Sequence, residues 1–278
     1  MVSRFLKSCF LTSLIGFPLA AQEPKPDKPE AIQDNSFLIE EAYNQEDGVI
    51  QHIQTFQYLK GDTWAYSFTQ EWPVGGLKHQ FSYTLPWQRI QSAPDGKAGG
   101  GDIALNYRYQ LLGDGNSIVA FSPRFSLLLP TGRNDQGRGS GAVGYQVNLP
   151  LSVVLGPQVV THFNIGVTRT PNAKSAIGDR ASLTAYNFGQ SFIWLARPNF
   201  NVMLEIAYAS GETVRGPGLK DPANSFYVSP GIRWAHNFSN GLQIVPGIAF
   251  PIGTGPSKGE RAVFFYLSFE HPFKKTAK

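Results

Sequence analysis

Residues Ala262–Phe273, AVFFYLSFEHPF, determine how the rest of the chain is interpreted. Every second residue from Val263 onward is almost always apolar, whereas the intervening set includes Ser268 and Glu270. A period of two indicates a β-strand with two different faces. An apolar strand with an aromatic end, close to the C-terminus of an exported chain, is typical of the last strand of a transmembrane barrel. This interpretation requires the same alternation in every earlier strand.

The alternation does recur, in about twelve strand-like runs that begin at residue 48. In one of them Leu105 and Tyr107 fall on one face, and Asn106 and Arg108 on the other. The sequence therefore predicts an all-β fold, a transmembrane antiparallel up-and-down β-barrel of about 12 strands over residues 48–273. In hydrocarbon every backbone amide must be paired, and a closed sheet leaves no edge.

A soluble lipocalin-like barrel would also alternate, so two further features are needed to separate the classes. All five tryptophans fall on the apolar face near strand ends, as in an interfacial aromatic girdle: Trp64, Trp72, Trp87, Trp194 and Trp234. Tight connections also alternate with long ones, and the predicted long loops are Gln88–Gly100, Thr131–Ser140, Arg169–Ser182, Ser210–Ser225 and Gly253–Glu260. Short periplasmic turns and long outer loops are the rule for outer-membrane barrels. Both features favour the membrane class.

The N-terminal residues predict export. Residues 1–21 have a charged start, an apolar centre and a small-residue end, and are interpreted as a signal peptide. Their removal takes the only cysteine, Cys9, and lowers the formal charge from +4 to +2, which gives no reason to expect nucleic-acid binding. Residues 22–47 are interpreted as a periplasmic leader, and residues 274–278 as a C-terminal tail.

The end of the leader, Ser36–Asp47, carries a mixture of apolar and acidic residues. Ser36 could cap a short helix there. This segment would be either a lid or plug at the periplasmic mouth, or simply an ordered approach to the first strand.

No arrangement of residues predicts catalysis, a metal site or a cofactor site. The five histidines lie singly on different strands, without metal-ligand spacing: His52, His79, His162, His236 and His271. Outer-membrane phospholipases place a nucleophilic serine two residues from a histidine, and no histidine here has one. We therefore expect no enzyme, no cofactor and no metal.

The charged residues on the polar face are the candidate lining of the barrel lumen. They are Glu71, Lys78, Asp102, Arg108, Arg124, Glu205, Arg233 and Glu270. Such residues either pair with one another across a filled lumen or line a path for solutes.

Gly99–Gly101 followed by Asp102–Tyr109 (DIALNYRY) resembles the conserved core of an outer-membrane family of transporters of the meta-pathway of phenol degradation. Residues Leu128–Gly132 (LLPTG) and the aromatic C-terminal strand are similar to that family too, whereas the tail after Phe273 departs from it. The resemblance covers most of the mature chain. It implies a single outer-membrane barrel and, by analogy, passage of hydrophobic or aromatic small molecules.

The sequence thus favours a passive outer-membrane channel for small apolar or aromatic solutes. Its expected partners are outer-membrane lipid, the barrel-assembly machinery during insertion, and lipopolysaccharide, whose phosphates the basic outer loops could meet. The main alternative is a closed structural or lipid-interacting barrel without transport. A lipid-modifying enzyme and a soluble lipocalin-like binder are further alternatives.

Overall fold

A computed structural model of the chain describes residues 35–59, 61–91 and 93–272. The predicted signal peptide, the first part of the leader and the C-terminal tail lie outside the described residues. The strands are β1 (Val49–Leu59), β2 (Thr63–Pro73), β3 (His79–Arg89), β4 (Ala98–Gly100), β5 (Ile103–Tyr109), β6 (Val119–Phe121), β7 (Arg124–Leu129), β8 (Gly144–Asn148), β9 (Leu151–Gly156), β10 (Val159–Lys174), β11 (Arg180–Arg197), β12 (Phe200–Gly216), β13 (Leu219–Trp234), β14 (His236–Asn237), β15 (Gln243–Ala249), β16 (Ile252–Gly253) and β17 (Ala262–Pro272).

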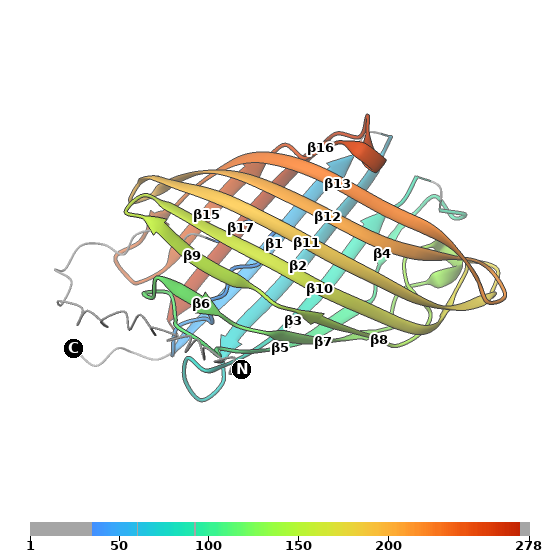
Figure 1. The fold of residues 1–278 in the computed structure, drawn as a ribbon, viewed down its shortest axis with the longest axis horizontal. Helices are drawn as coiled ribbons and strands as arrows, with labels where there is room; N and C mark the ends of the chain where they lie inside the picture. The colour runs from blue at the N-terminus through green and yellow to red at the C-terminus, as the bar shows by residue number, and fades with distance from the viewer. Residues whose placement is uncertain (1–34, 60, 92, 273–278) are drawn as a thin grey trace, which may run out of the picture. The chain divides into compact units, whose positions relative to one another are not determined.

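Several of these are halves of one interrupted strand, so the sheet is a closed antiparallel barrel of 12 strands. Each strand pairs with its neighbour in the chain, and β1 closes the barrel by pairing with β17 from Val49↔Pro272 to Leu59↔Ala262 (Figure 1). The interruptions include Pro123, between β6 and β7, and Pro150, between β8 and β9, where the missing amide hydrogen removes a ladder bond. The predicted fold class is confirmed.

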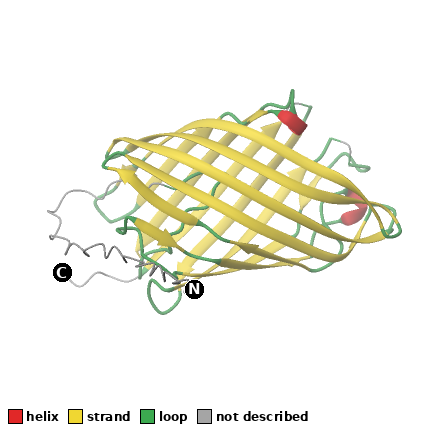
Figure 2. Cartoon of the chain, viewed as in Figure 1, coloured by secondary structure: helices red, strands yellow, loops and turns green. Residues whose placement is uncertain are grey.

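Helical structure is scarce in the described residues. It amounts to two single-turn 3₁₀ helices, η1 (Asn134–Gln136) and η2 (Gly255–Ser257), both in connections between strands (Figure 2). None of the helices in the described part of the chain is long and apolar enough to cross a membrane. The short helix predicted at Ser36–Asp47 does not form, because the amides of this segment bond to the barrel wall instead.

Two of the segments predicted to be long loops consist mostly of strand residues. β10 to β13 are 16 to 18 residues long and run side by side (Figure 1), so Arg169–Ser182 and Ser210–Ser225 are mostly paired hairpin. A transmembrane strand needs only about 9–11 residues, so these hairpins extend beyond the hydrocarbon. Charged residues are tolerated there because they meet water, and Lys220 pairs with Glu212 at 2.7 Å.

The barrel is apolar outside and polar inside. On β17 Phe265 is 47% exposed whereas Tyr266 is 5% exposed, as the alternation in this strand predicts. Ser126 and Glu205 are fully buried, while Phe125 is exposed on the outer face. A soluble barrel has the opposite arrangement, because its apolar side chains fill the core. An outer face of exposed aliphatic and aromatic side chains requires a lipid environment.

Candidate functional site

Residues 35–47 lie inside the barrel, and we call them the inner segment. Their backbone is held by side chains of the wall. The amides of Phe37, Leu38 and Ile39 all donate to one carboxylate oxygen, Oε1 of Glu205 on β12, at 2.9, 2.8 and 3.2 Å. Glu205 is itself fully buried. One lumen acid thus satisfies three successive backbone donors.

The next amides of the inner segment continue this pattern around the wall. Glu40 and Asn164 bond reciprocally, since the amide of Glu40 donates to Oδ1 of Asn164 and Nδ2 of Asn164 donates to the Glu40 carbonyl. The amide of Ala42 donates to the Ser152 hydroxyl at 2.8 Å. Further along, the amides of Asn44 and Gln45 donate to Gln110 and Gln80 respectively. Side chains therefore replace the backbone partners that a strand or helix would supply.

The carboxylate of Glu40 is the electrostatic centre of this site. Nε of Arg124 donates to both of its oxygens at 2.9 Å, Nη1 of Arg108 donates to Oε1 at 3.2 Å, and Nδ2 of Asn148 donates to Oε2 at 2.7 Å. Burial disfavours the charged carboxylate, but Arg124 and Arg108 outweigh it and hold the pKa of Glu40 below its usual value. Glu40 is therefore ionised at neutral pH.

Arg108 also binds the backbone of the inner segment. Its guanidinium donates to the carbonyls of Glu41 and Tyr43 and to the Asn44 side chain. Arg108 is 3% exposed, so this buried cation depends on the inner segment for most of its partners. Removal of the segment would take the Glu40 carboxylate and these carbonyl acceptors away from a buried guanidinium.

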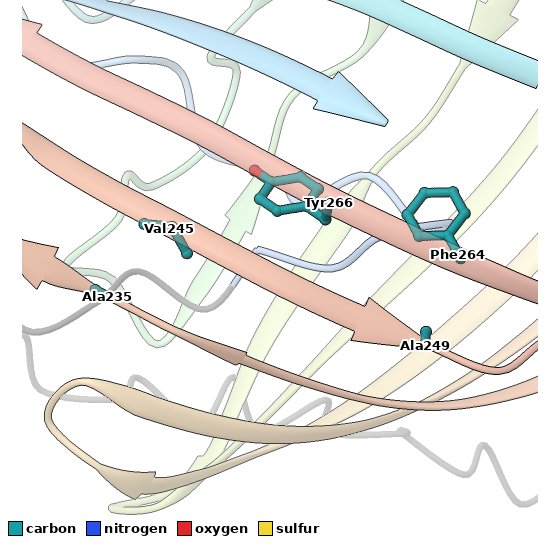
Figure 3. Packing of buried hydrophobic residues seen from close by; sticks show 5 residues of the cluster. All are labelled: Ala235, Val245, Ala249, Phe264 and Tyr266. Atoms are coloured by element: carbon teal, nitrogen blue, oxygen red, sulfur yellow. The ribbon is translucent and has the colours of Figure 1, made fainter. Parts of the chain in front are cut away.

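An apolar cluster on the lumen face receives the start of the inner segment. Ala235, Val245, Ala249, Phe264 and Tyr266 make up this cluster, with β15 and β17 side by side (Figure 3). The ring of Phe37 packs on those of Phe264 and Tyr266, with centroids 5.6 and 5.2 Å apart.

Glycines in the wall make room for this packing. A Cβ added at Gly247 would overlap the ring of Phe37, and one added at Gly189 would overlap Ile39. The wall is therefore shaped to hold the inner segment.

The inner segment leaves a cavity of about 650 Å³ in the lumen. Its apolar lining includes Phe37, Leu38 and Ile39 of the inner segment together with Ile53 and Tyr266. The rest of the lining is mainly hydroxyl and amide side chains of the strands, namely Thr55, Ser67, Thr69, Ser82, Thr84, Asn106, Gln146, Asn148, Asn164, Thr168 and Asn187. The cavity lining thus combines apolar and polar side chains.

Five of the eight predicted lumen residues lie at or near the inner segment. Arg108, Arg124 and Glu205 bond to it directly, Glu71 lines the cavity, and Arg233 is buried beside Gly247.

The other three predicted lumen residues do not join this group. Glu270 binds Gln51 of the neighbouring strand. Lys78 lies exposed in the turn before β3, because the strand begins two residues later than predicted. Asp102 accepts bonds from Gly132 and Ser140, so it organises the loops at the barrel end.

The five predicted interfacial tryptophans divide between the two ends of the barrel. Trp64 and Trp87 lie near the loop end of β2 and β3, and Trp72, Trp194 and Trp234 lie near the tight-turn end. Trp87, Trp194 and Trp234 are exposed on the outer face, whereas Trp64 and Trp72 are partly covered by neighbouring rings. Their contact with membrane interfaces stays a prediction.

Sequence reasoning missed Glu40 of the inner segment and the wall residues that bind the segment, chiefly Asn148, Asn164 and Ser152. A usable signal was present in the glycines at inward positions of long strands, since an inward glycine implies that something else fills the lumen. Within the described residues no group of three or more His, Cys, Asp or Glu side chains could hold a metal ion.

The fold is similar to that of solved outer-membrane proteins. An outer-membrane channel from Pseudomonas putida F1 aligns over 90% of this chain and 99% of its own, with a TM-score of 0.61 and 13% identity. The KdgM porin and a TodX deletion mutant, a monoaromatic hydrocarbon channel, have TM-scores of 0.43 and 0.42 at 9% and 10% identity. They align over 81% and 82% of this chain and 99% and 91% of their own.

Similarities at these identities show the fold alone, and the two lower scores support no further argument. No family model and no curated protein matches the sequence.

Proposed function

We propose that the protein is a passive outer-membrane channel for small solutes whose own inner segment closes its lumen. The observation that carries the proposal is a closed barrel, apolar outside, whose polar interior retains a cavity of about 650 Å³ beside the inner segment. A barrel that serves only as a scaffold has no need of a lined cavity of this size. In this proposal export uses the signal peptide, and insertion uses the barrel-assembly machinery.

The cavity lining supports small hydrophobic or aromatic solutes, and among them those that also carry a polar group. Phe37, Ile53 and Tyr266 offer an apolar wall on which a ring can pack. Thr55, Thr69 and the amide side chains of the lining offer hydrogen bonds. This class agrees with the resemblance to transporters of the phenol meta-pathway, which stays part of the proposal.

The test is the ionic current through the refolded mature protein in a planar bilayer, compared with an Arg124→Ala, Arg233→Ala double variant. An aromatic solute is detected by its block of the ionic current. Its flux is not a suitable readout, because such solutes also cross the lipid bilayer unaided. Discrete openings that the double variant alters, and that hydroxybenzyl alcohol blocks more than a sugar of similar size, are the expected result. Insertion without any openings in either protein would reject transport through the lumen.

A closed structural barrel is the second candidate, and the tightness of the inner segment favours it. Seven of its amides, those of residues 37–40, 42, 44 and 45, bond to side chains of the wall. Such a plug would keep the lumen shut in all conditions, and only lipid or lipopolysaccharide would then contact the protein. Insertion without openings is the outcome that selects this candidate.

A further inference from the structure

Side chains of the lumen wall form a binding site for a carboxylate, and in this structure the carboxylate of Glu40 occupies it. Two guanidinium groups and one amide converge on the Glu40 oxygens from three strands: Arg108 on β5, Arg124 on β7 and Asn148 on β8. Charge-assisted bonds of this kind are the strong, specific ones by which proteins hold carboxylates.

Most of this site is fixed by the wall and does not depend on the inner segment. The guanidinium of Arg124 donates to Oδ1 of Asn106 and Oε1 of Gln146, both at 3.1 Å, and to the hydroxyl of Ser126. These bonds leave Nε directed at the carboxylate.

The amide of Asn148 is oriented in the same way by its neighbours. Nδ2 of Asn187 donates to Oδ1 of Asn148 at 3.2 Å, so the amino group of Asn148 is turned toward the carboxylate. Arg124 and Asn148 are therefore arranged before any ligand arrives, which lowers the entropic cost of binding.

The site also faces the cavity. Glu40, Arg108, Arg124 and Asn148 are all among the residues that line the space of about 650 Å³. A solute in the cavity can therefore reach the guanidinium groups without passing through the wall. The ring-binding side chains Phe37 and Tyr266 line the same cavity.

We propose that Arg108, Arg124 and Asn148 form a binding site for small carboxylates, aromatic ones included, and that Glu40 occupies it as a tethered ligand. A free carboxylate competes with Glu40 for Arg124, and its binding removes a central contact of the inner segment. The inference deepens the proposed function, because it names an anionic class of solute and a step that loosens the closure. Since a tethered group acts at a high effective concentration, the wild-type protein binds free carboxylates weakly.

Benzoate binding to the refolded mature protein in detergent, measured by calorimetry, is the direct test. Glu40→Ala empties the site and is expected to tighten benzoate binding by about tenfold or more, because the competing group is gone. Glu46→Ala is the matched control: it makes the same change in charge on the same segment, at an exposed position, and is expected to bind as wild type. Glu40→Ala combined with Arg124→Gln is expected to lose the added affinity.

Two additions keep the outcome decisive. Glu40→Gln, which keeps the side-chain length, provides a second variant if Glu40→Ala fails the gel-shift assay for folding, and it also is expected to bind benzoate more tightly than wild type. Benzyl alcohol has the ring but no charge, and its binding is expected to be indifferent to Arg124→Gln. The proposal is overturned if neither Glu40 variant binds benzoate more tightly than Glu46→Ala does. It is also overturned if Arg124→Gln, combined with Glu40→Ala, leaves the benzoate affinity unchanged. Because calorimetry needs no conduction, benzoate binding without channel openings would reject the channel and keep the site.

Discussion

Replacement of Glu205 by alanine should release the start of the inner segment while leaving the barrel closed. The carboxylate accepts the amides of Phe37, Leu38 and Ile39, so Glu205→Ala leaves three donors without their acceptor. An unsatisfied buried donor costs roughly 1–3 kcal/mol. The three bonds share one oxygen and are therefore not additive, so we expect about 3–6 kcal/mol in total.

That free energy corresponds to a rise of roughly a hundredfold to ten-thousandfold in local opening, at about 1.4 kcal/mol per tenfold. Glu205→Gln keeps a neutral acceptor and loses only the charge assistance, so it should cost about 1–2 kcal/mol. Hydrogen–deuterium exchange of peptides that contain residues 37–39 measures the opening directly.

The control is Glu270→Ala, which removes another acid of the predicted lumen set, one that accepts a hydrogen bond from Gln51. Its exchange over residues 37–39 should match wild type. Equal protection in wild type and Glu205→Ala would refute the reasoning, because the three amides would then have another source of stability.

Three other perturbations test separate parts of the structure. Gly247→Ala forces a methyl group against the ring of Phe37 and should raise exchange at residue 37 by an amount equivalent to about 1–3 kcal/mol of overpacking. Phe125→Lys places a charge at an outward-facing position near the middle of the interrupted strand β6–β7 and should lower the free energy of unfolding in lipid vesicles by about 2–4 kcal/mol. Asp95 in the β3–β4 loop is bonded by Arg138 of the β7–β8 loop, and these hydrogen bonds hold the pKa of Asp95 well below its usual range. The contact should therefore stabilise the loops at every pH above about 3.9 and be lost only at lower pH. Proteolysis of wild type should be equally slow at neutral pH and at about pH 5, and faster at both for Asp95→Asn.

Each of these has a matched comparison or a contrary outcome. Gly156→Ala adds a methyl group in open space and should leave exchange at Phe37 unchanged. Leu219→Lys adds a charge at the tip of the β12–β13 hairpin and should cost little, because that position meets water. Loop cleavage of wild type that accelerates between neutral pH and about pH 5 would contradict the sign assigned to Asp95.

The fold could be predicted because alternate residues of a barrel strand face two different environments, lipid outside and the polar lumen inside. Phe265 and Tyr266 are neighbours in the chain, yet one is exposed and the other buried, as their places in the alternation require. The lengths of the connections were less predictable. Arg169–Ser182 and Ser210–Ser225 contain proline, glycine and several charged residues, which usually marks a loop. In this protein the strands simply continue beyond the membrane.

The charged wall residues of the candidate site could be predicted, but the inner segment that they bind could not. Arg108, Arg124 and Glu205 stand out as charges on a face that points away from lipid, so their inward position followed from period two. The inner segment that they contact could not be predicted, because it has no period of its own. Its amides bond to side chains from four different strands and to Gln110, just after β5. Contacts of such irregular backbone are set by tertiary structure, and local propensity carries no signal for them.

The central claim is that the inner segment lies inside the barrel wall, and thiol labelling of Ala42→Cys in refolded protein tests it most directly. The predicted mature chain has no other cysteine, and Ala42 of the inner segment is completely buried against the wall. A bulky, membrane-impermeant thiol reagent should leave Ala42→Cys unmodified in folded protein and modify it fully after denaturation, whereas exposed Glu46→Cys should react in both states. Labelling of folded Ala42→Cys at the rate of Glu46→Cys would place the segment outside the lumen and contradict the account.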